Sequence, residues 1–220
     1  MTTGVSFFGS TIGKKVVMAL SGIVLFGFVI GHMAGNLQLY LGAHALNEYS
    51  VFLREMLHGT GLWIARAVLL TAVGLHIWAA TSLTLEAHGA RPEGYRATRH
   101  RESTYASRTM VWSGPILLLF IVYHLLHLTF GTVHGSFIEG DVYHNVVAGF
   151  SVWPVSAFYI VAMLALGLHL RHGVWSMLQT LGLSHPRWNG LRAAFANLFA
   201  LVVVVGNISM PVAVLAGLVK

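Results

Sequence analysis

Five long apolar stretches, separated by short polar segments, restrict this chain to a narrow set of folds. A helix that spans a bilayer needs about 20 apolar residues. With 56% hydrophobic and 9% charged residues, the 220-residue sequence has little left for other structure. The stretches cover about residues 16–37, 62–85, 110–130, 154–177 and 193–219. The sequence therefore predicts an all-α membrane protein, with a single domain over residues 1–220 in which five transmembrane helices form one bundle.

Lysine and arginine are divided unequally between the two sides of such a bundle. If the chain starts in the cytoplasm, ten of the 13 lie on that side, namely Lys14, Lys15, Arg91, Arg96, Arg99, Arg101, Arg108, Arg171, Arg187 and Arg192. The other three are Arg54, Arg66 and Lys220. Because loops rich in these residues stay in the cytoplasm, we expect a cytoplasmic N-terminus and a C-terminus outside. The net charge of +6 then reflects topology and contact with anionic membrane lipid, and we expect no nucleic-acid partner.

Histidines inside the apolar stretches are the strongest functional signal. Four of the 13 histidines lie in four different stretches: His32, His76, His124 and His169. An ionisable group inside a membrane is costly unless it is paired, so each is a candidate for a functional site. With a rise of about 1.5 Å per residue, His32 and His124 lie roughly 25 Å from the inner boundary of the membrane. On the same scale, His76 and His169 lie roughly 15 Å from that boundary.

Two pairs of imidazoles at two depths predict two metal sites, as needed to carry an electron across a bilayer through two stacked haems. We pair His32 with His124 for the outer haem and His76 with His169 for the inner haem. The chain contains no cysteine, which excludes thioether attachment of haem and an iron–sulfur cluster of the usual kind. Both haems would therefore be held non-covalently.

These positions have rival interpretations. A single membrane histidine is often only a hydrogen-bonding group between helices. His127 and His172 each follow a proposed ligand by three residues, on nearly the same helix face, and are alternative ligands. Nearby glycines would let a flat macrocycle approach the backbone, although close helix packing explains them equally well. These glycines are Gly27, Gly31, Gly35, Gly74 and Gly167.

The remaining segments carry weaker signals. Residues 39–61, on the predicted outer side, have apolar positions spaced as in a short amphipathic helix lying on the membrane. We find no linker, low-complexity segment or strong internal repeat.

Several motifs extend over nearly the whole chain. They are STIGKKVVMALSG (10–22), HMAGNL (32–37), LNEY (46–49), SRTM (107–110), YHLLHL (123–128) and LHLRHGVWS (168–176). With these motifs the chain resembles the di-haem cytochrome b membrane anchor of succinate dehydrogenase and fumarate reductase, in its five-helix form. The resemblance implies that His32 and His124 ligate the haem distal to the soluble subunits, and His76 and His169 the proximal one. It also favours His169 over His172.

The resemblance implies a relay of electrons between an iron–sulfur subunit and membrane quinone, most simply menaquinone. A flavoprotein and the iron–sulfur subunit would lie on the cytoplasmic side of a bacterial inner membrane, and this chain would supply no catalytic residue for succinate oxidation. Some relatives have an acid two residues before the fourth ligand, where this chain has Gly167, so we expect no proton path of that kind. For the quinone site we look near the outer loop, among His44, Glu48, Glu55 and His58.

Two other functions fit parts of the pattern. Anchors of formate dehydrogenase or hydrogenase are also di-haem quinone cytochromes, but several of them place two ligands on one helix about a dozen residues apart, a spacing that no apolar stretch has here. A transporter or channel could use membrane histidines for protons or metal ions, and it would be colourless when purified. The sequence leaves a higher oligomer open.

Overall fold

The computed structural model describes residues 6–90 and 108–220, and this part of the chain is helical without any strand. The α-helices are α1 (Thr11–Asn36), α2 (Ala43–Glu55), α3 (Thr60–Gly89), α5 (Met110–His124), α6 (Val142–Ser151), α7 (Trp153–Thr180) and α8 (Asn189–Leu215). Within the described ranges, five helical segments are long and apolar enough to cross a membrane: Thr11–Leu41, Thr60–Gly89, Met110–Thr129, Trp153–Thr180 and Asn189–Leu215. The prediction of an all-α protein with five spanning helices is confirmed. The side of the membrane on which each end lies stays a prediction.

The observed helices differ from the predicted stretches mainly at their ends. α1 begins at Thr11 rather than near residue 16, because the Ser10 hydroxyl accepts a hydrogen bond from the Gly13 amide at 3.0 Å and caps the first turn. α8 ends four residues earlier than predicted. There Gly217 has φ of +70°, and the Leu218 amide donates to the Ala213 carbonyl at 2.9 Å, as in a glycine-terminated helix. Hydropathy marks the apolar part of a helix, whereas capping groups decide where the backbone hydrogen bonds stop.

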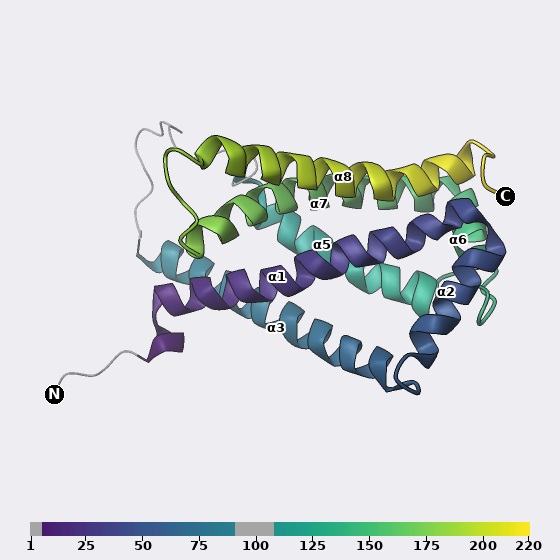
Figure 1. Cartoon of the computed structure of the whole chain (residues 1–220), viewed down its shortest axis with the longest axis horizontal. Helices are drawn as coiled ribbons and strands as arrows, with labels where there is room; N and C mark the ends of the chain where they lie inside the picture. The colour runs from purple at the N-terminus through teal and green to yellow at the C-terminus, as the bar shows by residue number, and fades with distance from the viewer. Residues whose placement is uncertain (1–5, 91–107) are drawn as a thin grey trace.

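The long helices run side by side, as Figure 1 shows. α1 packs against α3, α5 packs against α7, and α7 packs against α8. We call the end where α1 begins and α7 ends the basic end, and the end that carries α2, α6 and the C-terminus the far end. Lys14 on α1 and Glu86 on α3 form an ion pair at the basic end. The four arginines that the sequence analysis places between residues 91 and 107 lie outside the described residues.

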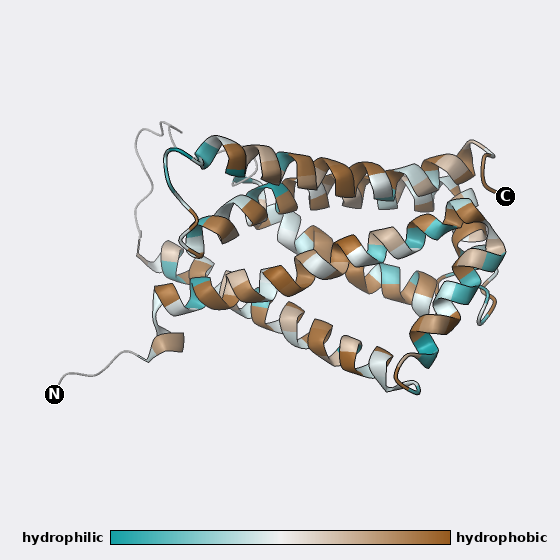
Figure 2. Ribbon diagram, in the orientation of Figure 1, coloured by the Kyte–Doolittle hydropathy of each residue, from teal (hydrophilic) through white to brown (hydrophobic). Residues whose placement is uncertain are grey.

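Hydropathy along the helices follows this division, because the central turns are mostly hydrophobic and the polar residues gather toward the two ends (Figure 2). Buried side chains form two clusters. One lies among α1, α7 and α8 and centres on Val203, which is fully buried. The other lies at the far end, where Leu39, Leu46 and Phe150 pack with the end of α8. Both clusters contain residues of α7 and α8. These two helices are the most buried of the five candidate spans.

Two short helices close the far end. α2 confirms the predicted amphipathic helix, whereas α6 was not predicted. The Asn47 amide of α2 donates to Asp141 Oδ1 at 2.9 Å, and Asp141 also accepts from the His144 amide at 3.0 Å as the N-cap of α6. The His144 amide, and then the Asn47 side chain, hold the pKa of the Asp141 carboxyl below its usual value.

Candidate metal centres

The first imidazole pair joins α1 and α5 in the half of the bundle nearer the far end. The ring centres of His32 and His124 are 5.7 Å apart, with planes at 90°. Each ring stacks on a phenylalanine one turn earlier on its own helix: Phe28 lies 5.1 Å from His32, and Phe120 lies 5.6 Å from His124. Because residues four apart share a helix face, each helix orients its own imidazole.

The second pair joins α3 and α7 in the half of the bundle nearer the basic end. The ring centres of His76 and His169 are 6.1 Å apart, with planes at 55°. A serine of a neighbouring helix faces each ring. Ser21 Oγ lies 3.3 Å from His76 Nδ1, and Ser113 Oγ lies 3.3 Å from His169 Nδ1.

These hydroxyls indicate which imidazole nitrogen is left for a metal. Ser21 Oγ lies 2.8 Å from the Val17 carbonyl, and when it donates its single hydrogen there it accepts a hydrogen bond from His76 Nδ1. The lone pair of His76 is then on Nε2. The Tyr159 hydroxyl lies 3.3 Å from His124 Nδ1, so Nδ1 has a hydroxyl neighbour in three of the four imidazoles. A metal-binding histidine is commonly held in this way, through its other ring nitrogen.

The spacing of both pairs suits one metal ion between two opposed imidazoles. Metal–imidazole bonds of about 2 Å place two such ring centres roughly 6 Å apart, and the observed values are 5.7 and 6.1 Å. The described residues contain no cluster of three or more histidine or acidic side chains that could hold a bare metal ion. Two imidazoles alone suit a metal whose remaining ligands come from a macrocycle, as in haem.

The glycines near these rings divide into two kinds. At Gly27, Gly31 and Gly74, nothing lies within 4 Å of the position that a Cβ would take, so a flat group could approach the backbone there. Gly35 and Gly167 instead face a side chain of another helix, Tyr49 of α2 and Val204 of α8. Helix packing therefore explains these two, and of the five glycines only the first three leave open space beside the backbone.

The two halves of the bundle repeat one arrangement. Ser21 and Ser113 are 92 residues apart, as are His32 and His124, and His76 and His169 are 93 apart. α1 and α3 thus correspond to α5 and α7. This repeat was not predicted from the sequence, although Gly74-Leu75-His76 recurs as Gly167-Leu168-His169. In each half, the histidine of the pair nearer the far end follows, by eleven positions, the serine that faces the pair nearer the basic end, which places the two levels about 16 Å apart.

The structure treats the two rival histidines differently. His127 lies in the π-helical turn Leu125–Thr129 and is 2% exposed. Its ring stacks on Tyr123 and on His134, and its Nδ1 lies 3.0 Å from the Tyr159 hydroxyl. A Cβ on Gly149 would come within 2.7 Å of that ring. His127 is therefore enclosed by protein and leaves no room for a macrocycle.

His172 also lacks the arrangement of a ligand. It is half-buried on α7, one turn beyond His169, and no other imidazole of the described residues lies opposite it. The ring opposite His76 belongs to His169.

A small cavity of about 130 Å³ lies beside His32 at the far end. Its polar lining residues are Asn36 of α1 and Tyr49 and Ser50 of α2. These three were not predicted from the sequence; the residues predicted instead are all exposed, namely His44, Glu48, Glu55 and His58. Tyr49 and Ser50 share a face of α2 with buried Leu46, and this i, i+3, i+4 spacing was the signal that could have identified them.

The fold and these two imidazole pairs define a class, namely integral membrane helical bundles with paired histidines inside the membrane. Residues 90–206, more than half of the chain, match the family model described as the succinate dehydrogenase/fumarate reductase transmembrane subunit. The chain belongs to this family, as its motifs suggested. It is thus a membrane subunit of such enzyme complexes. No curated protein and no solved structure matches it.

Proposed function

We propose that this chain is the cytochrome b anchor of a succinate:quinone oxidoreductase and relays electrons between an iron–sulfur subunit and membrane quinone. The observation that carries the proposal is that two pairs of imidazoles face each other inside the bundle. The ring centres are 5.7 Å apart in His32 and His124 and 6.1 Å apart in His76 and His169. Their two levels, about 16 Å apart along α1, would place two haems in sequence between the two ends of the bundle.

Four residues would hold the haems. His32 and His124 would ligate the haem nearer the far end, and His76 and His169 the haem nearer the basic end. Haem b, when bound, supplies one-electron exchange. The chain supplies the axial imidazoles, Ser21 and the other Nδ1 partners that orient them, and apolar helices that keep water away.

The partners follow from the charge and the cavities at the two ends. Flavoprotein and iron–sulfur subunits would dock at the basic end, on the cytoplasmic side of a bacterial inner membrane. Quinone, for which we propose menaquinone, would react at the far end in the cavity beside His32. There the Tyr49 hydroxyl and the second Nδ2 hydrogen of Asn36, whose first is donated to the His32 carbonyl at 2.8 Å, offer hydrogen bonds to the quinone oxygens.

The test is a reduced-minus-oxidised absorption spectrum with haem quantification on the purified complex. We expect two haems in the parent, loss of one in His32→Ala and loss of the other in His76→Ala. His127→Ala is the matched control, because that ring is enclosed by protein, and it should retain both haems. Unchanged haem content in both ligand variants, or a colourless parent, would reject the proposal, and a colourless parent would favour a transporter.

The identity of the complex needs its own measurement. We expect a flavoprotein and an iron–sulfur subunit with succinate dehydrogenase or fumarate reductase activity to co-purify with the chain. Subunits of another quinone-linked dehydrogenase would contradict this part of the proposal and leave the haem assignment standing.

A further inference from the structure

Arg192, in the first turn of α8, is a buried cation without an acidic partner. It is 6% exposed, and its guanidinium carbon lies 3.6 Å from the centre of the Trp175 ring of α7. One terminal nitrogen donates to the Leu183 carbonyl at 3.4 Å, and Nε has no hydrogen-bond partner. Among the described residues, the ion pairs are Lys14–Glu86 and His44–Glu48, and neither involves Arg192.

This burial needs an explanation, because arginine keeps its charge in proteins. A buried charge that lacks a counter-ion is strongly unfavourable. The Trp175 ring face attracts the cation but cannot accept a hydrogen bond in the plane of the guanidinium. Asn189 Oδ1, three residues earlier on α8, is also buried without a hydrogen-bond partner, but it is neutral and leaves the charge of Arg192 uncompensated. The buried charge therefore points to an anionic ligand.

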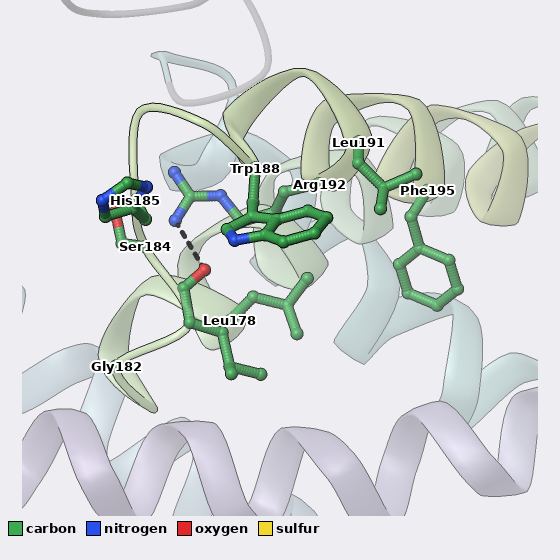
Figure 3. A pocket seen from close by; sticks show the side chains of 9 residues that line it. Leu178, Gly182, Ser184, His185, Trp188, Leu191, Arg192 and Phe195 are labelled. Carbon is green, nitrogen blue, oxygen red and sulfur yellow. Dashed lines mark hydrogen bonds between the residues drawn. The ribbon is translucent and has the colours of Figure 1, made fainter.

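A cavity of about 560 Å³ adjoins Arg192, between the end of α7 and the start of α8. Its walls are mostly apolar, with Leu178, Leu183 and Phe195 among them. Figure 3 shows Leu191, Arg192 and Phe195 on α8, whereas Ser184 and His185 lie on the loop that precedes this helix. The cavity thus joins one buried cation to an apolar surface.

That apolar surface continues along α8 into the span. Four side chains on one face of the helix are exposed, at intervals of four, three and four residues: Leu191 (65%), Phe195 (45%), Leu198 (61%) and Val202 (45%). Residues at this spacing form a continuous stripe. A ligand with an anionic head at Arg192 and a hydrocarbon chain along this stripe would match both features.

We propose that this cavity binds an anionic phospholipid, with its phosphate accepting hydrogen bonds from Arg192 and one acyl chain lying along the Leu191–Val202 stripe. The site lies at the basic end, where the apolar part of α8 begins, which is the level expected of lipid headgroups. A carboxylate of another protein would satisfy the charge but would leave the apolar stripe uncovered. Free phosphate would likewise use only the charge.

The test is native mass spectrometry of the full chain, purified in mild detergent with the subunits it carries. Dioleoylphosphatidylglycerol, dioleoylphosphatidylcholine and inorganic phosphate are the probes. We expect one phosphatidylglycerol per chain, held about tenfold more tightly than phosphatidylcholine and not displaced by phosphate. Arg192→Gln should abolish this preference. Arg187→Gln is the matched control, because it removes the same charge from an exposed residue of the loop before α8, and it should retain the preference.

Three outcomes would overturn the proposal. They are equal retention of the two lipids by the parent, unchanged phosphatidylglycerol binding in folded Arg192→Gln, and displacement of the lipid by inorganic phosphate. If Arg192→Gln fails to fold, Arg192→Lys keeps the charge but lacks the Nε donor, and it should show weaker binding than the parent. Unchanged binding in that variant would also overturn the proposal.

Discussion

Ser21→Ala offers a sharp test of how the imidazole pair nearer the basic end, His76 and His169, is held. Ser21 Oγ donates to the Val17 carbonyl at 2.8 Å and lies 3.3 Å from His76 Nδ1. The variant removes one of the two hydrogen-bond partners of the His76 ring, the other being the Met18 backbone, and leaves the ring itself in place. Loss of such a partner typically weakens metal binding by about 10- to 100-fold, or about 1.4 to 2.7 kcal/mol.

The assay is a potentiometric titration of the haem absorption bands with haem quantification. We expect lower occupancy and a higher midpoint potential for one haem only. The potential should rise because an imidazole that loses a hydrogen-bond acceptor at Nδ1 is a weaker base and stabilises ferric iron less. The haem ligated by His32 and His124 should be unaffected, because it lies about 16 Å away along α1.

Ser151→Ala is the control, because the Ser151 hydroxyl also donates to a carbonyl one turn earlier, at 2.8 Å, but it is exposed at the end of α6 and contacts none of the four ligands. The reasoning fails if Ser21→Ala leaves both haems unchanged. It also fails if Ser151→Ala produces the same shift, because the effect would then be one of general stability.

Two further predictions concern the far end. Gly149→Ala places a Cβ within 2.7 Å of the enclosed His127 ring, so we expect a loss of about 1 to 3 kcal/mol in thermal unfolding, whereas Gly135→Ala, which has open space around it, should change little. The Asp141 carboxyl has a lowered pKa in the folded state, so its contribution to stability should be fully present above its ordinary pKa and be lost as the pH falls through the lowered value. Asp141→Asn keeps an N-cap but should flatten that part of an acid unfolding profile measured by circular dichroism, and an unchanged profile would contradict the assignment.

The repeat of α1–α3 in α5–α7 explains why two sites of the same kind occur in one bundle. Each half supplies a serine, a histidine at the level nearer the far end and a histidine at the level nearer the basic end, at matching separations. Each metal site then draws one imidazole from each half, so neither half has a complete site alone. We infer that α8, which packs on α7 outside this repeat, contributes packing and the Arg192 cavity rather than ligands.

The sequence by itself determined the five spans and the heights of the four histidines. Both follow from one dimension: the bilayer sets the length of an apolar helix, and the helical rise converts residue number into depth. The structure brings together the same two pairs of rings that the depth estimate selects.

Only the tertiary structure decided what surrounds each side chain. His124 and His127 lie three residues apart and look alike in the sequence, yet the π-helical turn and Gly149 of α6 enclose one ring and leave the other facing His32. The burial of Arg192 likewise depends on Trp175, which arrives from α7. Hydropathy reports position along the membrane normal, whereas rotation about a helix axis and contacts between distant segments are settled only when the helices pack.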